Sequence, residues 1–507
     1  MTRSPTPLPA PGSDAPTPPI ELPDSSTATG RLRTDLVDVP DQVRRRLADA
    51  CSAVTDDHGV RAEASRDWWP LAMTWALDNQ VPALAALVAR PADPAEVAAV
   101  LAICNEARVP VTAIAGRSGV CGASSPVHGG VALDLTGLHG VRSVDDESLV
   151  LDVLPGTFGD TLEAQLRATH GLTLGHWPQS VALSTVGGWL ACRSAGQLSN
   201  RYGKIEDLVV GLDVVLADGR TIHTGGSPRS AVGPDLTQVF VGSEGTLGII
   251  TGARLRLRPA PEVEEHAAFA FRSWHDGMAA CRRILRRGAD PAVLRLYDDV
   301  ESDRSYQTGE GRHVLLVMDE GDPLTVDANM RIVADECSAA DILDDGLVAR
   351  WMGHRNDVAT LESLVRNGFV VDTLEVSAPW SCLDSIYRAT VAGLSAIDGV
   401  RAASAHQSHA YTDGACLYFS FAGRPPAGDG DRFYRQCWDV GTRAVLANGG
   451  SLSHHHGIGL NRSRFVGESL GSAFDALVAL KRALDPVGIL NPGKLGLPDP
   501  FGDVEWP

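Results

Sequence analysis

Two adjacent glycines stand among mostly small residues in the stretch Ser184-Thr-Val-Gly-Gly-Trp-Leu-Ala-Cys-Arg-Ser-Ala-Gly196. Because glycine has no Cβ and tolerates positive φ, such a backbone can turn its N–H groups toward a closely bound anion or ring system. The hydroxyls of Ser184, Thr185 and Ser194 add short hydrogen-bond donors without bulk. The stretch therefore predicts one wall of a cofactor site, with a glycine-rich structural turn as the alternative.

Two further glycine-rich segments accompany apolar, strand-like sequences. The first, Ile114-Ala-Gly-Arg-Ser-Gly-Val-Cys-Gly122, directly follows an apolar run, and a loop at this place is typical of pyrophosphate binding. In Val239–Ile250 a short apolar strand, a turn rich in Gly, Ser and Thr, and a second strand follow one another. None of the three segments opens a helix with GxGxxG, so the ordinary nicotinamide-binding fold is not supported.

Five motifs, ordered along most of the chain after about residue 80, indicate the fold more specifically. They are Ser184-Thr-Val-Gly-Gly-Trp189, Arg201-Tyr-Gly-Lys-Ile-Glu-Asp-Leu208, Gly242-Ser-Glu-Gly-Thr-Leu-Gly248, Gly414-Ala-Cys-Leu-Tyr-Phe419 and Gly449-Gly-Ser-Leu-Ser-His-His-His-Gly457. Together they resemble the vanillyl-alcohol oxidase type of FAD-binding flavoproteins, and within that superfamily the alkylglycerone-phosphate synthase branch. The resemblance implies an α+β fold, with a two-subdomain FAD-binding domain and a substrate cap domain built on an antiparallel sheet.

The resemblance implies that FAD is the cofactor. The expected FAD-binding residues are Ile114, Ala115, Gly116, Arg117, Ser118, Gly119, Val120, Gln179, Ser180, Ser184, Thr185, Gly187, Gly188, Arg193, Ser194, Gly242, Ser243, Glu244, Gly245, Thr246, Gly248 and Ile249. Covalent flavin attachment in this superfamily often uses a histidine in the first glycine-rich loop, and residues 116–122 contain none. Noncovalent FAD is therefore expected, with a thioether to Cys121 as the alternative.

Composition and hydrophobic periodicity divide the chain into five parts. Residues 1–30 are rich in Pro, Ser, Thr and Asp and are predicted to be disordered. Residues 31–80 are expected to form a helical N-terminal segment, and 81–260 the FAD-binding domain. Longer helices and separated strands over 261–450 predict an antiparallel sheet backed by helices, and the resemblance implies that this part is the substrate cap. The resemblance implies that residues 451–507 return toward the flavin.

The net charge indicates the kind of partner, and the cysteine content indicates the compartment. The chain has 507 residues and a net charge of −19, which argues against nucleic acid and against electrostatic docking on anionic lipid. The expected partner is a small molecule, in one interpretation an acyl lipid. Nine cysteines without a CxxC pair favour a reducing compartment and no structural zinc.

Segments that would direct the protein to a membrane are missing from the sequence. No apolar stretch reaches spanning length and the N-terminus has no signal core, so a cytoplasmic protein with at most peripheral membrane contact is expected. The C-terminus Asp503–Pro507 is no peroxisomal signal. The aromatic run Trp68–Leu77 is predicted to pack in the core, with an acyl channel or a membrane surface as the alternative. A homodimer is a further possibility, because helices of the cap could form a dimer interface.

Three consecutive histidines, His454, His455 and His456, follow a helix expected over residues 439–448. In an extended chain alternate residues face opposite ways, which predicts His454 and His456 on one face and His455 on the other. Without carboxylate or thiolate partners at fixed spacing the run is poor metal-ligand geometry, so no metal is predicted. The resemblance implies that the triplet is functionally required, and imidazoles can exchange protons or bind phosphate near neutral pH.

Four other residues are candidates for the same pocket. Tyr418 matches the acid/base tyrosine of the family, whose phenol can serve only if nearby cations lower its pKa; simple strand packing is the alternative. Arg295 matches a family arginine near the flavin, where its cation can stabilise negative charge; an exposed strand edge is the alternative. His406 and His409 precede Tyr418 and are weaker candidates.

One position departs from the family pattern. The synthases place a phosphate-binding arginine about fifteen residues before the motif that is Glu375–Trp380 in this chain, and counting back reaches Leu361 and Glu362. An acid there would repel phosphate. Arg355 or Arg366 is the substitute if the loop is shifted.

Two enzymatic functions therefore compete. In the first, the protein resembles the ether-lipid enzyme, which makes alkyl-dihydroxyacetone phosphate from acyl-dihydroxyacetone phosphate and a fatty alcohol without net redox change. In the second, it is an FAD-linked dehydrogenase or oxidase of a hydroxylated substrate such as a 2-hydroxy acid. The histidine triplet and Tyr418 favour the first; Glu362 and the ending Asn491-Pro-Gly-Lys494 favour the second. A flavin-binding module without catalysis is disfavoured, because such a module would lose its acids, bases and cations.

Overall fold

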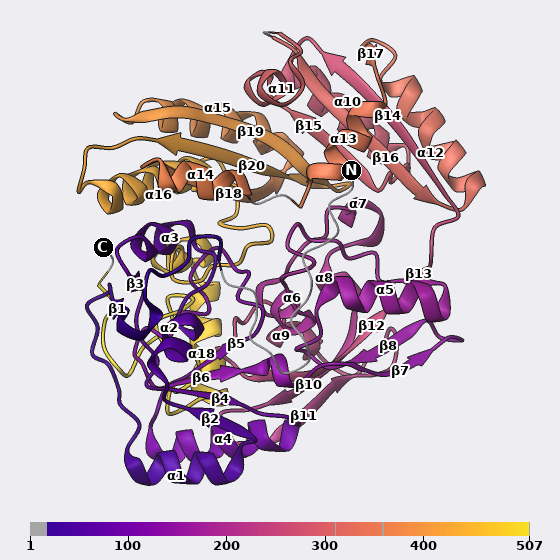
Figure 1. The fold of residues 1–507 in the computed structure, drawn as a ribbon. Helices are drawn as coiled ribbons and strands as arrows, with labels where there is room; N and C mark the ends of the chain where they lie inside the picture. The colour runs from indigo at the N-terminus through magenta and orange to yellow at the C-terminus, as the bar shows by residue number, and fades with distance from the viewer. Residues whose placement is uncertain (1–17, 310, 357–358, 506–507) are drawn as a thin grey trace.

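The computed structural model describes residues 18–309, 311–356 and 359–505. Figure 1 shows a lower domain that carries the three glycine-rich segments, called here the glycine-loop domain, and an upper cap domain built on antiparallel strands. The last part of the chain leaves the cap and returns to the lower domain. The histidine triplet lies on this returning segment, where His454 contacts Glu375 of the cap and Lys204 of the glycine-loop domain.

The first subdomain contains a four-stranded sheet in the order β2-β4-β6-β5. Strands β4 and β5 run parallel to β6, and β2 is antiparallel to β4. Helix α4 begins at Pro94, because Asp93 caps it and proline suits the first turn. The elements are β1 (Thr29–Gly30), α1 (Asp41–Ala50), β2 (Ala53–Thr55), α2 (His58–Ala64), α3 (Pro70–Ala76), β3 (Gln80–Val81), β4 (Leu87–Arg90), α4 (Pro94–Ala107), β5 (Val111–Ile114) and β6 (Val131–Asp134).

The second subdomain contains a five-stranded antiparallel sheet in the order β11-β10-β12-β8-β7. Strands β10 and β11 form a hairpin, with Gly219 at φ +85 in its turn. The elements are β7 (Val141–Asp145), β8 (Val150–Val153), α5 (Gly159–His170), β9 (Leu172–Thr173), α6 (Val186–Cys192), α7 (Ser199–Tyr202), α8 (Ile205–Leu208), β10 (Val209–Val215), β11 (Thr221–Gly225), α9 (Thr237–Phe240), β12 (Ile249–Arg256) and β13 (Arg258–Pro259).

The cap is a seven-stranded antiparallel sheet in the order β17-β14-β16-β15-β19-β20-β18. Helices α15 and α16 pack on the half formed by β18 to β20. The strands are β14 (Val263–Phe271), β15 (Val293–Tyr297), β16 (His313–Gly321), β17 (Asp341–Leu343), β18 (Val370–Pro379), β19 (Val400–Ala410) and β20 (Gly414–Gly423). The helices are α10 (Trp274–Arg286), α11 (Asp299–Tyr306), α12 (Pro323–Glu336), α13 (Gly346–His354), α14 (Ala359–Arg366), α15 (Trp380–Ser395) and α16 (Gly430–Ala447).

The predicted disorder through residue 30 is wrong for residues 18–30. Ile20 is fully buried in a cluster with Met73 and Val365, and β1 pairs in parallel with β3. A large apolar side chain that finds a pocket on a folded domain can offset the entropy of ordering its polar neighbours. Residues 1–17 lie outside the described ranges.

The aromatic run on α3 packs in the core, as predicted. Trp69 and Trp75 are buried and donate their indole N–H groups to Tyr434 and Asp431 of α16, each at 2.8 Å. These contacts join the N-terminal segment to the cap. Within the described ranges, no helix is both long and apolar enough to cross a bilayer.

The C-terminal segment, with α17 (Val466–Leu470) and α18 (Ala473–Leu484), returns to the glycine-loop domain. Leu490 forms a parallel bridge with Val111 at the start of the strand before the first glycine-rich loop. Asn491 donates its side-chain N–H to the backbone oxygen of Glu244 at 2.7 Å. The end of the chain thus contacts both the strand before the glycine-rich segment 114–122 and the glycine-rich segment 239–250.

Candidate active site

The three glycine-rich segments form one surface. The backbone N–H of Gly242 donates to Leu190 of α6 at 2.8 Å, and a Cβ on Gly116 would lie 2.2 Å from the backbone oxygen of Leu183. Gly119 and Gly188 on this surface are exposed, and a side chain at either would meet no close neighbour: a Cβ on Gly119 would lie 3.7 Å from Asp67 Oδ2. A Cβ on Gly188 would meet only Thr185 Oγ1 at 3.4 Å. This open, side-chain-free backbone fits the close approach of a flat, anionic cofactor.

The hydroxyls expected to face the cofactor instead bond within the protein. Ser184 Oγ donates to the backbone oxygen of Ser180 at 2.8 Å, and Thr185 Oγ1 caps the N-terminus of α6. Ser194 Oγ bonds His176 Nε2 at 2.7 Å. A serine or threonine just before a short helix satisfies that helix first, so the backbone is what this wall offers to a ligand.

Gly188→Leu is expected to weaken FAD binding by about tenfold or more and to yield nearly colourless protein. The added side chain would project from α6 into the open space, while a helical leucine is better tolerated than glycine by the fold itself. The flavin-to-protein absorbance ratio measures the effect. Gly467→Leu, at an exposed helical glycine of α17, is the control that should stay yellow. A yellow Gly188→Leu protein would refute the cofactor wall.

Glu375 of β18 organises the histidine triplet. Its carboxylate is fully buried and accepts the backbone N–H groups of His454, His455 (3.2 Å) and His456 (2.9 Å). Arg462 pairs with the same carboxylate at 2.9 Å and is also buried. One carboxylate from the cap therefore fixes the backbone of all three histidines.

The prediction that alternate histidines face opposite ways is wrong. Residues 451–460 form bends rather than a strand, and the Nδ1 atoms of the adjacent His454 and His455 lie 2.9 Å apart. Convergence of three backbone N–H groups on Glu375 curls the chain. The rings of neighbouring residues consequently lie in one cluster.

The triplet is neutral near pH 7. Burial lowers the pKa of His456 to about 4, and burial together with the neighbouring histidines and Lys204 lowers the pKa of His454 and His455 well below the usual value. Burial alone would raise the pKa of Glu375, but Arg462 holds it below its ordinary range. The cluster therefore combines an ionised acid with imidazoles that can accept protons.

The neutral state of His456 predicts a stability that falls with acid. Between the folded pKa of about 4 and an unfolded value of about 6.5, the unfolded chain binds more protons, so the free energy of unfolding drops by about 1.4 kcal/mol per pH unit as pH falls. His456→Gln removes this titrating imidazole. The free energy of unfolding of the variant, measured with urea, should therefore change less between pH 7 and pH 5 than that of wild type. Asp67 and Asp298 have buried carboxyls with pKa values near 7, so their protonation raises the free energy of unfolding as pH falls. This opposite contribution is the same in wild type and in His456→Gln. The exposed His275→Gln is the control, and parallel curves for wild type and His456→Gln would contradict the argument.

Tyr418 of β20 lies inside the histidine cluster. Its ring stacks on His406 at 4.9 Å and 18° and lies 5.5 Å from His456. Its hydroxyl accepts a hydrogen bond from Thr373 at 3.1 Å. The condition that nearby cations lower its pKa is not met, because burial raises the pKa of Tyr418 above its usual value and outweighs Arg295. Tyr418 is therefore an O–H donor at neutral pH.

Arg295, His406 and Glu301 form a chain behind Tyr418. Arg295 donates to Tyr297 Oη at 2.8 Å and contacts Nε2 of His406. Because guanidinium only donates, Nε2 of His406 is an acceptor and its proton is on Nδ1, which bonds Glu301 at 2.7 Å. Burial and Arg295 lower the pKa of His406 to about 4. His406 thus lies between Arg295 and the ring of Tyr418.

His409 joins the cluster from the other side. Its ring stacks on His454 at 4.9 Å, and its Nδ1 bonds Ser199 Oγ at 2.7 Å. One nitrogen each of His409, His454 and His455 lies within 4.8 Å of the others, a spacing that could hold a metal ion. His454 Nε2 already bonds Tyr411 at 3.0 Å. That no metal belongs here stays a prediction.

The structure places the candidate phosphate residues apart. Glu362 and Arg366 of α14 form a half-exposed ion pair at 2.8 Å, which neutralises the acid that was expected to repel phosphate. Arg355 instead lies against two tryptophans, Trp177 and Trp351.

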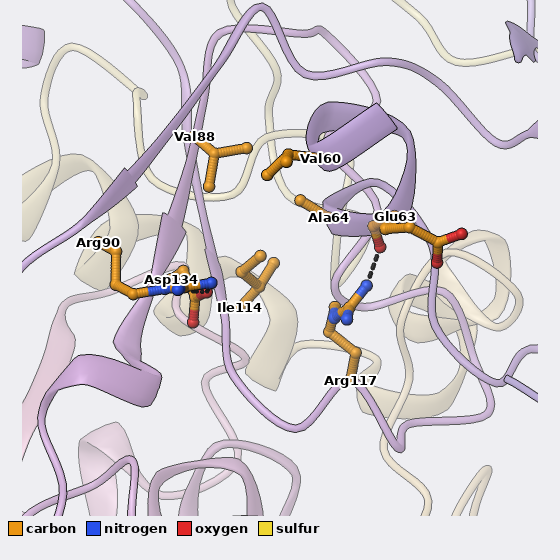
Figure 2. A pocket seen from close by; sticks show the side chains of 8 residues that line it. All are labelled: Val60, Glu63, Ala64, Val88, Arg90, Ile114, Arg117 and Asp134. Carbon is orange, nitrogen blue, oxygen red and sulfur yellow. Dashed lines mark hydrogen bonds and ion pairs between the residues drawn. The ribbon is translucent and has the colours of Figure 1, made fainter. Parts of the chain in front are cut away.

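Figure 2 shows a separate hollow beside the first glycine-rich segment. It is lined by Val60, Glu63, Ala64, Val88, Arg90, Ile114, Arg117 and Asp134. Arg117, an expected FAD-binding residue, has φ +52 and donates to the backbone oxygen of Glu63, while Arg90 pairs with Asp134 at 2.8 Å. The lining contains neither histidine nor tyrosine, so this hollow is distinct from the histidine cluster.

Comparison with known proteins agrees with this arrangement. Two family models match: "FAD binding domain" over residues 85–225 and "FAD linked oxidases, C-terminal domain" over residues 260–495. The uncharacterized FAD-linked oxidoreductase YgcU of Escherichia coli strain K12 is 32% identical over 76% of this chain and 83% of the relative. Alkyldihydroxyacetonephosphate synthase of Dictyostelium discoideum is 29% identical over 81% and 73%. The glycolate oxidase subunit GlcD of Bacillus subtilis strain 168 is 29% identical over 80% and 88%.

A solved structure of alkyldihydroxyacetonephosphate synthase has a TM-score of 0.76 and 25% identity, covering 93% of this chain and 89% of that chain. The fold and the site thus define a two-domain flavoenzyme with an antiparallel cap, as predicted. The chain belongs to the vanillyl-alcohol oxidase type of FAD-linked oxidases, and FAD is its cofactor.

Proposed function

We propose that the protein is an FAD-dependent transferase that converts an acyl-dihydroxyacetone phosphate and a fatty alcohol to alkyl-dihydroxyacetone phosphate and a fatty acid. The observation that carries this proposal is the packing of Tyr418 against His406 and His456 in a cluster of neutral imidazoles. Exchange of the substituent on C1 needs a proton acceptor and an O–H donor at one carbon. Similarity to the alkyldihydroxyacetonephosphate synthases over most of the chain supports the same reaction.

In this proposal each residue of the cluster has a separate role in the reaction. His455 or His456, neutral at working pH, accepts the C1 proton and returns it. Tyr418 donates its O–H to the substrate carbonyl oxygen, and the cation of Arg295 stabilises the negative charge that develops there. The chemistry that FAD supplies when bound is nucleophilic, with no net oxidation of the substrate.

We infer that the FAD is held noncovalently. Burial raises the pKa of the Cys121 thiol well above its usual value, so little thiolate forms for a thioether link. Acid precipitation should leave a colourless pellet and a yellow supernatant. A yellow pellet would contradict the inference.

Product analysis tests the proposed reaction. Purified flavoprotein is incubated without an electron acceptor with palmitoyl-dihydroxyacetone phosphate and hexadecanol, and both products are quantified by mass spectrometry. Equal amounts of hexadecyl-dihydroxyacetone phosphate and palmitate are expected. If neither forms, the transferase assignment fails.

Oxidation of a small 2-hydroxy acid is the second candidate. The neutral imidazole of His456, which suits proton transfer in the first reaction, would equally accept a hydroxyl proton. The glycolate oxidase subunit of Bacillus subtilis is similar over most of this chain. Reduction of an artificial acceptor by glycolate or D-lactate, without alkyl product, would replace the first assignment by this one.

A further inference from the structure

A chain of hydrogen bonds connects five side chains beside the histidine triplet. Nδ1 of His455 lies 2.9 Å from Nδ1 of His454, whose Nε2 bonds the hydroxyl of Tyr411 at 3.0 Å. The same hydroxyl bonds Ser199 Oγ at 3.1 Å, and Ser199 Oγ bonds Nδ1 of His409 at 2.7 Å. Every link has the length of an ordinary hydrogen bond, so the chain is continuous from His455 to His409.

This chain is assembled from three parts of the fold. His409 lies on β19 of the cap and Tyr411 directly follows that strand, whereas Ser199 begins α7 of the glycine-loop domain. The histidine triplet belongs to the returning segment. The side-chain oxygen of Asn200, next to Ser199, accepts the backbone N–H of Ala410 at 2.9 Å. This contact holds α7 against the end of β19 and so keeps both hydroxyls between the imidazoles.

The hydrogen bonds of the chain can run in either of two directions. A neutral imidazole has one donor and one acceptor nitrogen, and a hydroxyl can accept one hydrogen bond while it donates another. If His455 donates from Nδ1, every link follows and His409 carries its proton on Nε2. In the opposite direction, His455 carries its proton on Nε2 and His409 on Nδ1. Neither Nε2 has a hydrogen-bond partner among the described residues, so each end can meet a further donor or acceptor.

A positive charge is disfavoured at these imidazoles. Burial, together with neighbouring imidazoles and Lys204, lowers the pKa of His409, His454 and His455 well below the usual value. Burial also raises the pKa of Tyr411, so its phenol stays neutral. A histidine of this cluster that accepted a proton alone would become a poorly stabilised cation. Release of another proton at the far end of the chain avoids that charge.

We propose that Tyr411 and Ser199 form a proton relay through which His455 acts as a base without becoming a cation. This rests on the proposed function, in which a histidine takes the C1 proton and returns it, and it selects His455 for that role. The relay residues do not touch the substrate. They act through His455 and are positioning residues.

The transfer of protons along the relay is balanced. When the bond between C1 and its hydrogen breaks, the electron pair remains with the substrate and the proton binds Nε2 of His455. Each hydrogen bond of the chain then passes one proton on, and Nε2 of His409 gives a proton to water. Return of the proton to C1 reverses every transfer, so the chain is reset within one turnover and carries no net charge at any stage.

The tautomers of the histidines, read by nitrogen NMR of the FAD-loaded protein with isotope-labelled histidine, test the relay without turnover. In wild type His455 should carry its proton on Nδ1, which leaves Nε2 ready to accept. Ser199→Ala removes the acceptor of the Tyr411 hydroxyl, which must then donate to Nε2 of His454. The reversal should move the proton of His455 to Nε2, although Ser199 does not bond His455. Comparison with His455→Gln assigns the signal. A change confined to His409, or a wild-type His455 already protonated on Nε2, would overturn the proposal.

Turnover tests whether the relay is used. Tyr411→Phe and Ser199→Ala break the chain at different links, and each should lower kcat for alkyl product by about tenfold or more with less change in KM. The double variant should be no slower than the slower single variant, because a broken chain cannot be broken again. Ser199→Thr keeps the hydroxyl and should be faster than Ser199→Ala. Tyr387→Phe, at a ring that stacks on Trp274, is the control that should keep wild-type kcat. Multiplied losses in the double variant would indicate two separate structural effects and overturn the relay.

Failure of the relay and failure of the proposed function give different results. Alkyl product formed by Tyr411→Phe at the wild-type rate would overturn the relay and leave the transferase function standing. If wild type forms no alkyl product while Ser199→Ala still reverses the tautomer of His455, the function fails. That reversal would still support the chain as the route by which His455 exchanges a proton.

Discussion

Glu375→Gln is expected to lower the free energy of unfolding by about 3–5 kcal/mol and to abolish turnover. Glu375 and Arg462 form a fully buried ion pair at 2.9 Å. Removal of the negative charge leaves Arg462 uncompensated, since two other nitrogens of its guanidinium have no hydrogen-bond partner in the described chain. The cost is that of one buried, unpaired cation.

The same substitution disturbs the histidines. The glutamine oxygen can still accept N–H groups, but its NH2 would face the N–H of a histidine that now meets a carboxylate oxygen. The backbone of His454–His456 must then move, and with it the rings around Tyr418. Catalytic groups must be held closely for proton transfer, so activity should fall further than stability.

Urea unfolding and product formation measure both effects. Glu362→Gln, which breaks the half-exposed pair with Arg366, is the matched control and should cost less than about 1 kcal/mol. The double variant Glu375→Gln with Arg462→Met should recover stability without activity, because it removes the unpaired charge but not the misplacement of the histidines. Wild-type stability in Glu375→Gln alone would show that the buried pair does not support the loop.

The glycine-rich surface and the antiparallel cap could be predicted because their signals are local. Glycine spacing after a strand, as in residues 114–122, and alternating apolar strands reflect backbone geometry that does not depend on distant residues. The meeting of Tyr418 with His455 and His456 was implied by the resemblance. The hydroxyl of Thr185 was assigned to the cofactor because a sequence does not show that a helix cap competes for it.

The organising acids could not be predicted. Glu375 begins the family motif Glu375–Trp380, but nothing in the neighbouring sequence shows what its carboxylate binds, because its partners come from a loop far along the chain. Glu301 likewise matters only through its contact with His406 on another strand. The direction of the pKa shift of Tyr418 could not be predicted for the same reason, because burial is a property of the assembled fold and outweighs a neighbouring cation.

Tyr418→Phe is expected to leave a folded, yellow protein and to reduce turnover by about 100-fold or more. The change removes one hydroxyl, while the ring keeps its stacking on His406. Thr373 loses an acceptor, at a cost of about 1 kcal/mol. Bound flavin is read from visible absorption, stability from urea unfolding, and turnover from alkyl product.

The raised pKa of Tyr418 adds a prediction about the pH dependence of turnover. The phenol stays protonated from about pH 7 to about pH 9, so wild-type turnover should show no rise from phenolate formation in that range. Tyr387→Phe, which removes a phenol hydroxyl where the ring stacks on Trp274 rather than on histidine, should keep wild-type turnover. Loss of activity in Tyr418→Phe but not in Tyr387→Phe, with flavin retained in both, identifies the phenol as the proton donor. Near-normal turnover in Tyr418→Phe would instead transfer that role to the imidazoles.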